Sequence, residues 1–274
     1  TWRGADRDTG AYEVWSRRGM VRFRRLVDDE GALHFDVIEV MGQNPIADQD
    51  PFALNTLALE RSAATESGFE ARHAEQRFIA PEQQTYPFGY ERAAQLFDSP
   101  NAPDLAVSPK DWCSGNQPGM HGALHVRQAR APLWFSGVCV RAGRHELAAR
   151  SVDIAPTVLH ALGFPTVDGV DASGTPSAQV YLARQDGRVL HEVLDPTTPR
   201  PQRLYVFLMD GMHQTELEER LHHDRYRFPN LFRLWERAAV LAGGSIVNFP
   251  SITWPSHTAI VTGAWCGHHD VVNP

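Results

Sequence analysis

The stretch LYVFLMDG, residues 204–211, decides how we interpret the fold of this chain. An unbroken apolar run of this length is typical of a strand that is buried on both faces, as in a parallel sheet. Asp210 ends the run, and open α/β sheets place their ligand crevice at the carboxyl ends of such strands. A carboxylate buried there needs a compensating partner, which could be a divalent metal, the cap of the next helix or an arginine. Asp210 is therefore a candidate metal ligand.

The segments after this run alternate between helical and extended patterns. The sequence predicts a helix over residues 229–240 and a short strand at residues 246–247. A loop over residues 248–254 follows, and Pro255 is placed as the first residue of a further helix, where its missing N–H is not needed. Strand, helix, strand and helix in this order predict an α/β fold with a mainly parallel sheet.

Thr253 lies just before the helix that is expected to begin at Pro255. A helix N-terminus offers free N–H groups and a partial positive charge, which suit a phosphate oxygen. A threonine hydroxyl is a poor nucleophile at neutral pH unless a base or a metal lowers its pKa, and a metal held by Asp210 could bind the alkoxide directly. Thr253 is therefore a candidate nucleophile, with the alternative that Thr253 or Ser256 only caps the helix.

Three motifs in this part of the chain together resemble a known family. They are LMDG at 208–211, FPNL at 228–231 and FPSITWPSHTAIVTGAWCGHH at 249–269. They resemble the type I phosphodiesterase/nucleotide pyrophosphatase branch of the alkaline phosphatase superfamily. That family has an aspartate at the end of its first core strand, and a threonine followed by an aromatic residue, a proline, a small polar residue and a histidine.

The resemblance implies roles for particular residues. Asp210 would ligate one of two divalent metal ions, expected to be zinc, and Thr253 would be the nucleophile that also binds that zinc. His257 would be structural. Some family members hold the phosphate with an asparagine in the region that follows, which makes Asn273 a candidate substrate-binding residue.

The resemblance also implies a fold and a reaction. The fold would be a three-layer alkaline-phosphatase-like α/β core, incomplete in this chain. The reaction would be metal-dependent hydrolysis of a small phosphate ester or nucleotide through a phosphothreonine intermediate. Two alternatives stay open: another hydrolase of the superfamily, such as a phosphomonoesterase or a sulfatase-like enzyme, and a non-catalytic module that keeps the fold. Sulfatases use a Cys or Ser that becomes formylglycine, which Thr253 cannot form.

The first half of the chain resembles the carboxyl-terminal part of the same superfamily. The matching segments are GMHG at 119–122, an apolar run at 132–137 and the helix-like stretch VDIAPTVLHALG at 152–163. In the superfamily the His-Gly supplies a metal ligand, so the resemblance makes His121 a candidate zinc ligand. A neutral imidazole is a common ligand of zinc.

The order of these segments is reversed relative to the family. We divide the chain into residues 1–165, which resemble the end of the superfamily core, a linker at 166–202, and residues 203–274, which resemble its beginning. One permuted domain is the favoured interpretation, and a clipped tandem of two domains is the alternative. The family's other metal ligands, in Asp-x-x-x-His and Asp-His-Gly motifs, follow the nucleophile and do not occur here. We therefore expect a fragment that is inactive alone.

Composition excludes several classes of function. The formal net charge of −7, with no basic stretch to offset it, argues against binding of a nucleic-acid duplex. No run of 18 or more apolar residues is present, so no membrane span is expected. The three cysteines have no CxxC spacing, which argues against a cysteine zinc site. Neither a compartment nor an oligomeric state follows from these features.

The remaining predictions concern local structure. Residues 11–27 and 33–40 are expected to form paired strands, with Arg22, Arg24 and Arg25 on the solvent face. Residues 41–100 are expected to be loops with one or two short helices, and residues 104–107 a buried strand.

Overall fold

The first 42 residues of the chain form an antiparallel sheet. We analysed a computed structural model, which describes residues 10–28, 33–53, 84–109, 121–165, 182 and 185–272. Strand β1 (Ala11–Ser16) pairs with β2 (Gly19–Val27), and β2 pairs with β3 (Leu33–Gly42), both antiparallel. The predicted pairing of two strands is confirmed, except that a turn at residues 17–18 divides the first segment into two strands.

One prediction for this sheet is wrong. Arg25 is only 4% exposed, although we expected it on the solvent face with Arg22 and Arg24. Alternate residues of a strand share a face, and Arg25 falls on the same face as the buried Val21 and Phe23. Arg24 does face solvent, and its guanidinium contacts Asp36 at 3.5 Å on the exposed side.

The buried face of this sheet packs on helix α3 (Gly89–Leu96), which joins it to the rest of the molecule. Within residues 41–53 and 84–100, α3 is the one helix that the structure contains, in agreement with the prediction of loops and a short helix. Residues from both ends of the chain share this core. The cluster consists of Val21, Phe23, Ile46, Ala93, Ala94, Leu96, Leu124, Phe249, Cys266 and Val272.

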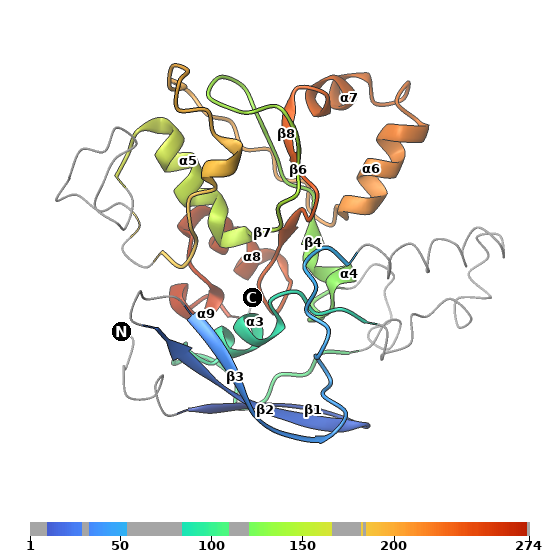
Figure 1. The fold of residues 1–274 in the computed structure, drawn as a ribbon, viewed down its shortest axis with the longest axis vertical. Helices are drawn as coiled ribbons and strands as arrows, with labels where there is room; N and C mark the ends of the chain where they lie inside the picture. Colours follow the sequence, from blue (N-terminus) through green and yellow to red (C-terminus); the bar gives the residue numbers. More distant parts are fainter. Residues whose placement is uncertain are drawn as a thin grey trace.

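Two small mixed sheets lie in the middle of the molecule (Figure 1). Strand β9 (Ser245–Ile246) pairs antiparallel with β4 (Arg130–Ala131) and parallel with β7 (Ala149–Arg150). Strand β8 (Ala238–Leu241) pairs antiparallel with β5 (Trp134–Ser136) and parallel with β6 (Gly143–His145). The α/β class is therefore confirmed, whereas the described residues contain no large, mainly parallel sheet.

The apolar run at residues 204–209 does not form the predicted buried strand. It is an irregular segment in which Tyr205 is 72% and Phe207 is 80% exposed. In the described part of the chain, residues 204–208 make no backbone hydrogen bond to another backbone group. A strand requires a neighbour that accepts its hydrogen bonds, and none of the described strands lies in register with this run. The predicted strand at residues 104–107 is also wrong, since Leu105 and Val107 are each 77% exposed.

Helix α5 (Ile154–Leu162) confirms the helix predicted over residues 152–163, with Gly163 ending it in the left-handed conformation. A short 3₁₀ turn, η3 (Ser151–Asp153), precedes it. The helix buries Ala155, Pro156 and Thr157, but not the stripe of larger apolar residues formed by Ile154, Val158, Leu159 and Leu162. That stripe is only half-buried because part of it lines a cavity, described below.

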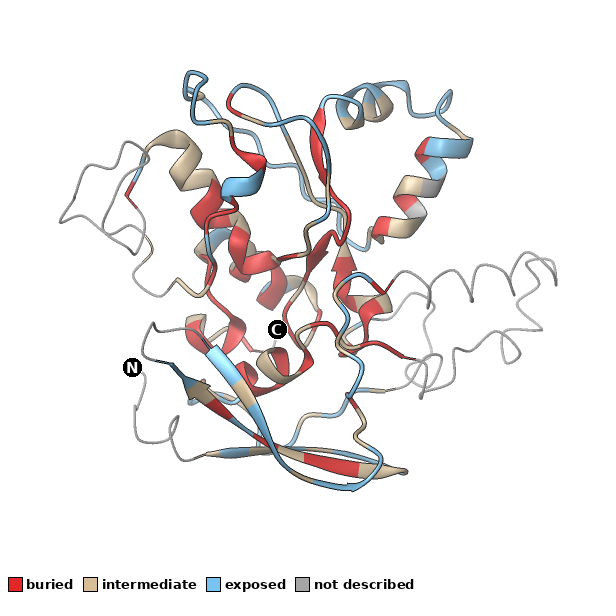
Figure 2. Ribbon diagram, in the orientation of Figure 1, coloured by how far each residue is buried: buried red, intermediate tan, exposed pale blue. Residues whose placement is uncertain are grey.

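Helices α6 (Gln214–His223) and α7 (Pro229–Trp235) lie together at the exposed edge of the molecule, as Figure 2 shows. The helix predicted over residues 229–240 ends early, because its last part is the buried strand β8. The final helices are α8 (Thr253–Thr262) and α9 (Cys266–His269), which pack near the centre. Short helices α4 (Val126–Ala129) and η4 (His191–Val193) complete the described elements.

None of the helices in the described residues has the length and apolarity that crossing a bilayer requires. The division at residues 166–202 stays a prediction. Of that segment, residues 182 and 185–202 are described, and Val189, Leu190 and Val193 within it are buried in a cluster with Ala239 and Leu241.

Candidate active site

Thr253 is the first residue of helix α8, and Ile252 before it is extended. The helix thus begins two residues earlier than we predicted from Pro255. Pro255 remains within the first turn, where the amide groups have no partner inside the helix. The Thr253 side chain therefore lies at the positive end of a ten-residue helix, as the sequence suggested.

Asp210 and Thr253 lie in contact. The Thr253 hydroxyl donates a hydrogen bond to Asp210 Oδ2 at 3.2 Å, across 43 positions of the sequence. Asp210 is exposed and sits in a turn in which the Met212 amide donates to the Met209 carbonyl at 3.4 Å. Gly211 follows with φ 70°, a left-handed conformation that favours glycine. The two residues that sequence reasoning singled out are thus neighbours, even though the strand expected before Asp210 is not formed.

The loop that precedes Thr253 is held from two sides. The Phe249 carbonyl accepts hydrogen bonds from Gln95 Nε2 at 3.3 Å and from Cys266 Sγ at 3.2 Å. Burial raises the pKa of the Cys266 thiol to about 11, so the thiol keeps its proton and donates at neutral pH. The side-chain amide of Asn248 donates a hydrogen bond to the Pro250 carbonyl at 2.7 Å. These contacts fix the loop on α3 and α9 and so fix where α8 begins.

His121 is bound to the same loop from the first half of the chain. Its Nδ1 contacts the Ser251 carbonyl at 2.7 Å, and Ser251 Oγ donates to the Ala123 carbonyl at 3.2 Å. A carbonyl oxygen only accepts, so Nδ1 carries the proton and the neutral ring has its lone pair on Nε2. Anchoring of one ring nitrogen on a carbonyl is how metal-binding histidines are commonly oriented. Gly122, at φ 124°, passes close to Ile252, which a side chain there would contact at 3.3 Å.

These residues open on a cavity of about 660 Å³. Asp210, Thr253, His121 and His257 lie on its lining, and His257 is one turn along α8 from Thr253. The rest of the lining comes from the exposed run at residues 204–209, from one face of α5, and from the segment around β5, including Trp134 and Phe135. The hydroxyl–carboxylate pair therefore faces a space large enough for a small-molecule substrate.

The donor atoms fit a zinc ion in kind. Asp210 offers a carboxylate, Thr253 a hydroxyl oxygen, and His121 a ring nitrogen in the tautomer that a metal requires. Their number is too small for a two-metal centre, and among the residues that the structure describes no group of three or more His, Cys, Asp or Glu side chains is arranged so that it could hold a metal ion. Asn273, the candidate phosphate-binding residue, lies outside the described residues.

Sequence reasoning missed the residues that position the loop. Gln95, whose side chain contacts Phe249, is 154 positions away in the sequence, and Ser251, whose carbonyl holds His121, is 130 positions from it. No local pattern marks such contacts, because each depends on packing between distant segments. The one available signal was the resemblance that placed His121 and Thr253 in one superfamily core.

Comparison with known families gives a match to part of the chain. The model of the Type I phosphodiesterase / nucleotide pyrophosphatase family matches residues 204–273. This confirms the resemblance for the segment that contains both Asp210 and Thr253, and it does not extend to the first half of the chain. No curated protein and no solved structure shows a significant match.

Proposed function

We propose that Asp210 and Thr253 form the nucleophile centre of a metal-dependent phosphate-ester hydrolase of the phosphodiesterase/nucleotide pyrophosphatase type. The observation that carries the proposal is the 3.2 Å contact between the Thr253 hydroxyl and Asp210 Oδ2, which lies inside the segment that the family model matches. The cavity beside this pair supplies room for a phosphate ester or nucleotide.

Asp210, Thr253 and His121 would hold zinc in this site, with further ligands completing the two-ion centre. Such ions, when bound, lower the pKa of a coordinated hydroxyl and neutralise charge on a phosphate. The proton of the Thr253 hydroxyl passes along its hydrogen bond to Asp210 and on to solvent, and Oγ1 forms a bond to phosphorus. The P–O bond to the leaving alcohol breaks, and the alcohol takes up a proton from solvent. Water then cleaves the phosphothreonine ester and restores the hydroxyl.

The start of α8 would bind the phosphate during both steps. Its first amide groups have no partner inside the helix, because the first helical hydrogen bond runs from the Ser256 amide to the Ile252 carbonyl at 3.0 Å. Free amides and the positive end of the helix stabilise negative charge on the non-bridging oxygens. The helix thus supports the intermediate without a side-chain cation.

A turnover assay tests this function. Zinc-supplemented full-length protein should release nitrophenol from a nitrophenyl phosphodiester, and Thr253→Ala should lower kcat by about 10³-fold or more, as loss of a covalent nucleophile does. Thr253→Ser keeps a hydroxyl and should retain part of the activity. Thr258→Ala, which removes a hydroxyl from the same helix, serves as the matched control. Turnover by Thr253→Ala at the wild-type rate would contradict the assignment of Thr253 as the nucleophile. Absence of zinc-dependent turnover in the wild-type protein would favour the alternative of a non-catalytic module.

We propose further that both halves of the chain build one permuted domain with a shared site. The support is the pair of contacts that join residues 121–123 to Ser251, next to the nucleophile. His121→Ala should then weaken zinc binding by about 10- to 100-fold, measured by competition with a chelating dye. Zinc affinity that does not change in His121→Ala would favour the tandem alternative, in which His121 belongs to another site.

A further inference from the structure

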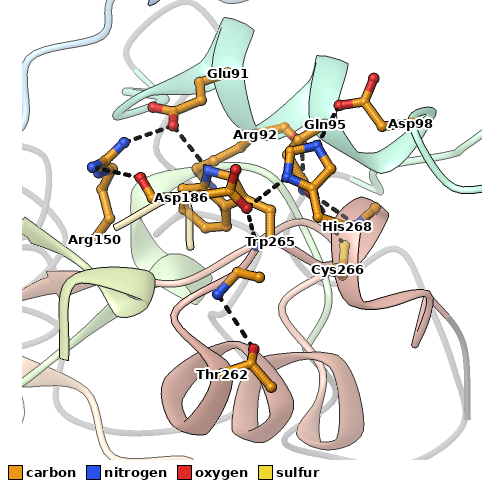
Figure 3. A network of polar contacts seen from close by, with 12 residues as sticks. Glu91, Arg92, Gln95, Asp98, Arg150, Asp186, Thr262, Trp265, Cys266 and His268 are labelled. Atoms are coloured by element: carbon orange, nitrogen blue, oxygen red, sulfur yellow. Dashed lines mark hydrogen bonds and ion pairs between the residues drawn. The ribbon is translucent and has the colours of Figure 1, made fainter. Parts of the chain in front are cut away.

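His268, on helix α9, is buried between two carboxylates that come from distant parts of the sequence. It is 5% exposed. Its Nδ1 lies 2.5 Å from Asp186 Oδ2, and its Nε2 lies 2.7 Å from Asp98 Oδ2, as Figure 3 shows. Ionised carboxylates only accept hydrogen bonds, so both ring nitrogens must donate and the ring must be an imidazolium. No local pattern in the sequence singles out His268, since its partners are 82 and 170 positions away.

Each of the two carboxylates is bound to a further part of the chain. Asp98 receives two hydrogen bonds of 2.7 Å from the Arg25 guanidinium, on strand β2. Asp186 Oδ2 accepts a hydrogen bond of 2.7 Å from the Trp265 amide, at the start of α9. His268 therefore joins four segments through charged contacts: the first sheet, the end of α3, the segment at 185–188 and α9.

Other charged groups surround this cluster. The Trp265 indole donates to Glu91 at 2.8 Å, and Glu91 pairs with Arg150 (Figure 3). Arg150 also pairs with Asp153. The titratable or charged groups around the cluster are Tyr12 and Arg25 from the first sheet, Glu91, Arg92 and Asp98 from α3 and its end, Arg150 and Asp153 before α5, Asp186, and Cys266, His269 and Asp270 around α9. If His268 were neutral, carboxylates in this cluster would outnumber the cations that pair with them.

The pKa values agree with this geometry. Burial acts to lower the pKa of His268, but the hydrogen bonds to Asp186 and Asp98 outweigh it, and the net pKa is raised above the ordinary 6.5. Burial acts to raise the pKa of Asp98, but Arg25 and His268 outweigh it, and the net pKa is lowered. Since the folded pKa of His268 is raised, its stabilising contribution is complete below pH 6.5 and is lost as pH rises through the folded value.

We infer that His268 is a pH-dependent latch, which in its protonated form holds α9 against α3 and the segment at 185–188, and which opens when the ring loses its proton as pH rises. Release of α9 would also loosen the loop before Thr253, because Cys266 on α9 and Gln95 on α3 both bind the Phe249 carbonyl. The latch itself does not depend on the proposed hydrolase function.

Two measurements on the same samples test the latch. The pKa of His268 is read from the NMR shift of its ring proton, and the opening of α9 from amide hydrogen exchange of residues 264–272, corrected for the intrinsic effect of pH. In wild type, exchange of this segment should rise by up to about tenfold for each pH unit between the ordinary pKa of 6.5 and the folded pKa, and should level off above the folded pKa. His268→Gln cannot become an imidazolium, so its α9 should exchange rapidly at every pH. His269→Gln is the matched control and should keep the wild-type dependence.

If His268→Gln does not fold, Asp98→Asn serves instead. Removing one carboxylate should shift the midpoint of opening to lower pH, by the same amount as it lowers the pKa of His268. An ordinary pKa for His268, exchange of α9 that does not follow that pKa, or loss of the pH dependence in His269→Gln would each overturn the latch. Enzymatic turnover is not a readout here, so failure of the proposed function would leave this result unchanged.

Discussion

In two regions of the molecule, burial does not follow the polarity of the side chains: the cluster around His268 and the apolar run at residues 204–209. The cluster gathers charged side chains and is buried, with Arg25, Asp98 and His268 each less than a tenth exposed. The run contains only apolar and aromatic side chains, yet Tyr205 and Phe207 are mostly exposed. Polarity alone would have assigned the two regions the other way round.

The difference shows that burial of a segment depends on whether its polar groups find interaction partners, and not only on the polarity of its side chains. In the cluster, Arg25, Asp98, Asp186 and His268 each meet an opposite charge with hydrogen-bond geometry, which offsets the loss of hydration. In the run, the side chains favour burial, but the backbone has no neighbouring strand within the described residues that could pair with it. A strand therefore forms only where another strand pairs with its backbone, whereas a charged pair needs only two side chains in contact.

The largest effect is expected from breaking the buried pair. Arg25→Ala leaves Asp98 buried beside a single cation and should lower the free energy of unfolding by about 3–5 kcal/mol, measured by urea denaturation. Arg24→Ala is the matched control, because Arg24 contacts Asp36 at the exposed side of the same strand and should change stability by less than about 1 kcal/mol. Similar effects of the two substitutions would contradict the burial of Arg25.

A smaller effect, with a defined pH dependence, is expected at Asp98. Asp98→Asn should destabilise the protein by about 1.5–3 kcal/mol at neutral pH, because Arg25 and His268 lose a charged acceptor. The folded pKa of Asp98 is lowered, so its contribution is complete above the ordinary value of 3.8 and is lost as pH falls through the folded value. Unfolding curves of both proteins should therefore converge in acid. A difference that persists unchanged there would show that the charge of Asp98 is not its source.

The smallest effect is expected in the apolar run. Phe207→Ser should change the free energy of unfolding by no more than about 0.5 kcal/mol, because the Phe207 ring is 80% exposed. Phe23→Ala, in the core beneath the first sheet, should lower it by about 3–5 kcal/mol and provides the contrast. A decrease in the free energy of unfolding in Phe207→Ser as large as that in Phe23→Ala would contradict the exposure of the run.

Sequence reasoning succeeded where the signal is local. Alternating apolar residues predicted strands β2 and β3, and the pattern before Gly163 predicted helix α5. It also singled out Asp210 and Thr253, whose side chains lie in contact, because a carboxylate after an apolar run and a hydroxyl at a helix start are each recognisable within a few residues. Their catalytic roles stay proposals.

Sequence reasoning failed where the outcome depends on distant partners. We predicted no role for His268, since nothing near it in the sequence points to Asp98 or Asp186. Residues 238–241 continued a helical pattern, and pairing with β5 and β6 made them a strand. Residues 204–209 have the composition of a strand, but no neighbouring strand in the described part of the chain pairs with them. These cases share a cause: tertiary pairing overrides local preference.

The most direct test of the central claim is to trap the covalent intermediate on Thr253. Zinc-loaded full-length protein is mixed with a nitrophenyl phosphodiester, quenched in acid within one turnover, digested and analysed by mass spectrometry. We predict a phosphoryl adduct on Thr253, which is absent from Thr253→Ala and present in Thr258→Ala. Turnover in the same sample with no adduct on Thr253, or with an adduct on another residue, would contradict the assignment of Thr253 as the nucleophile beside Asp210.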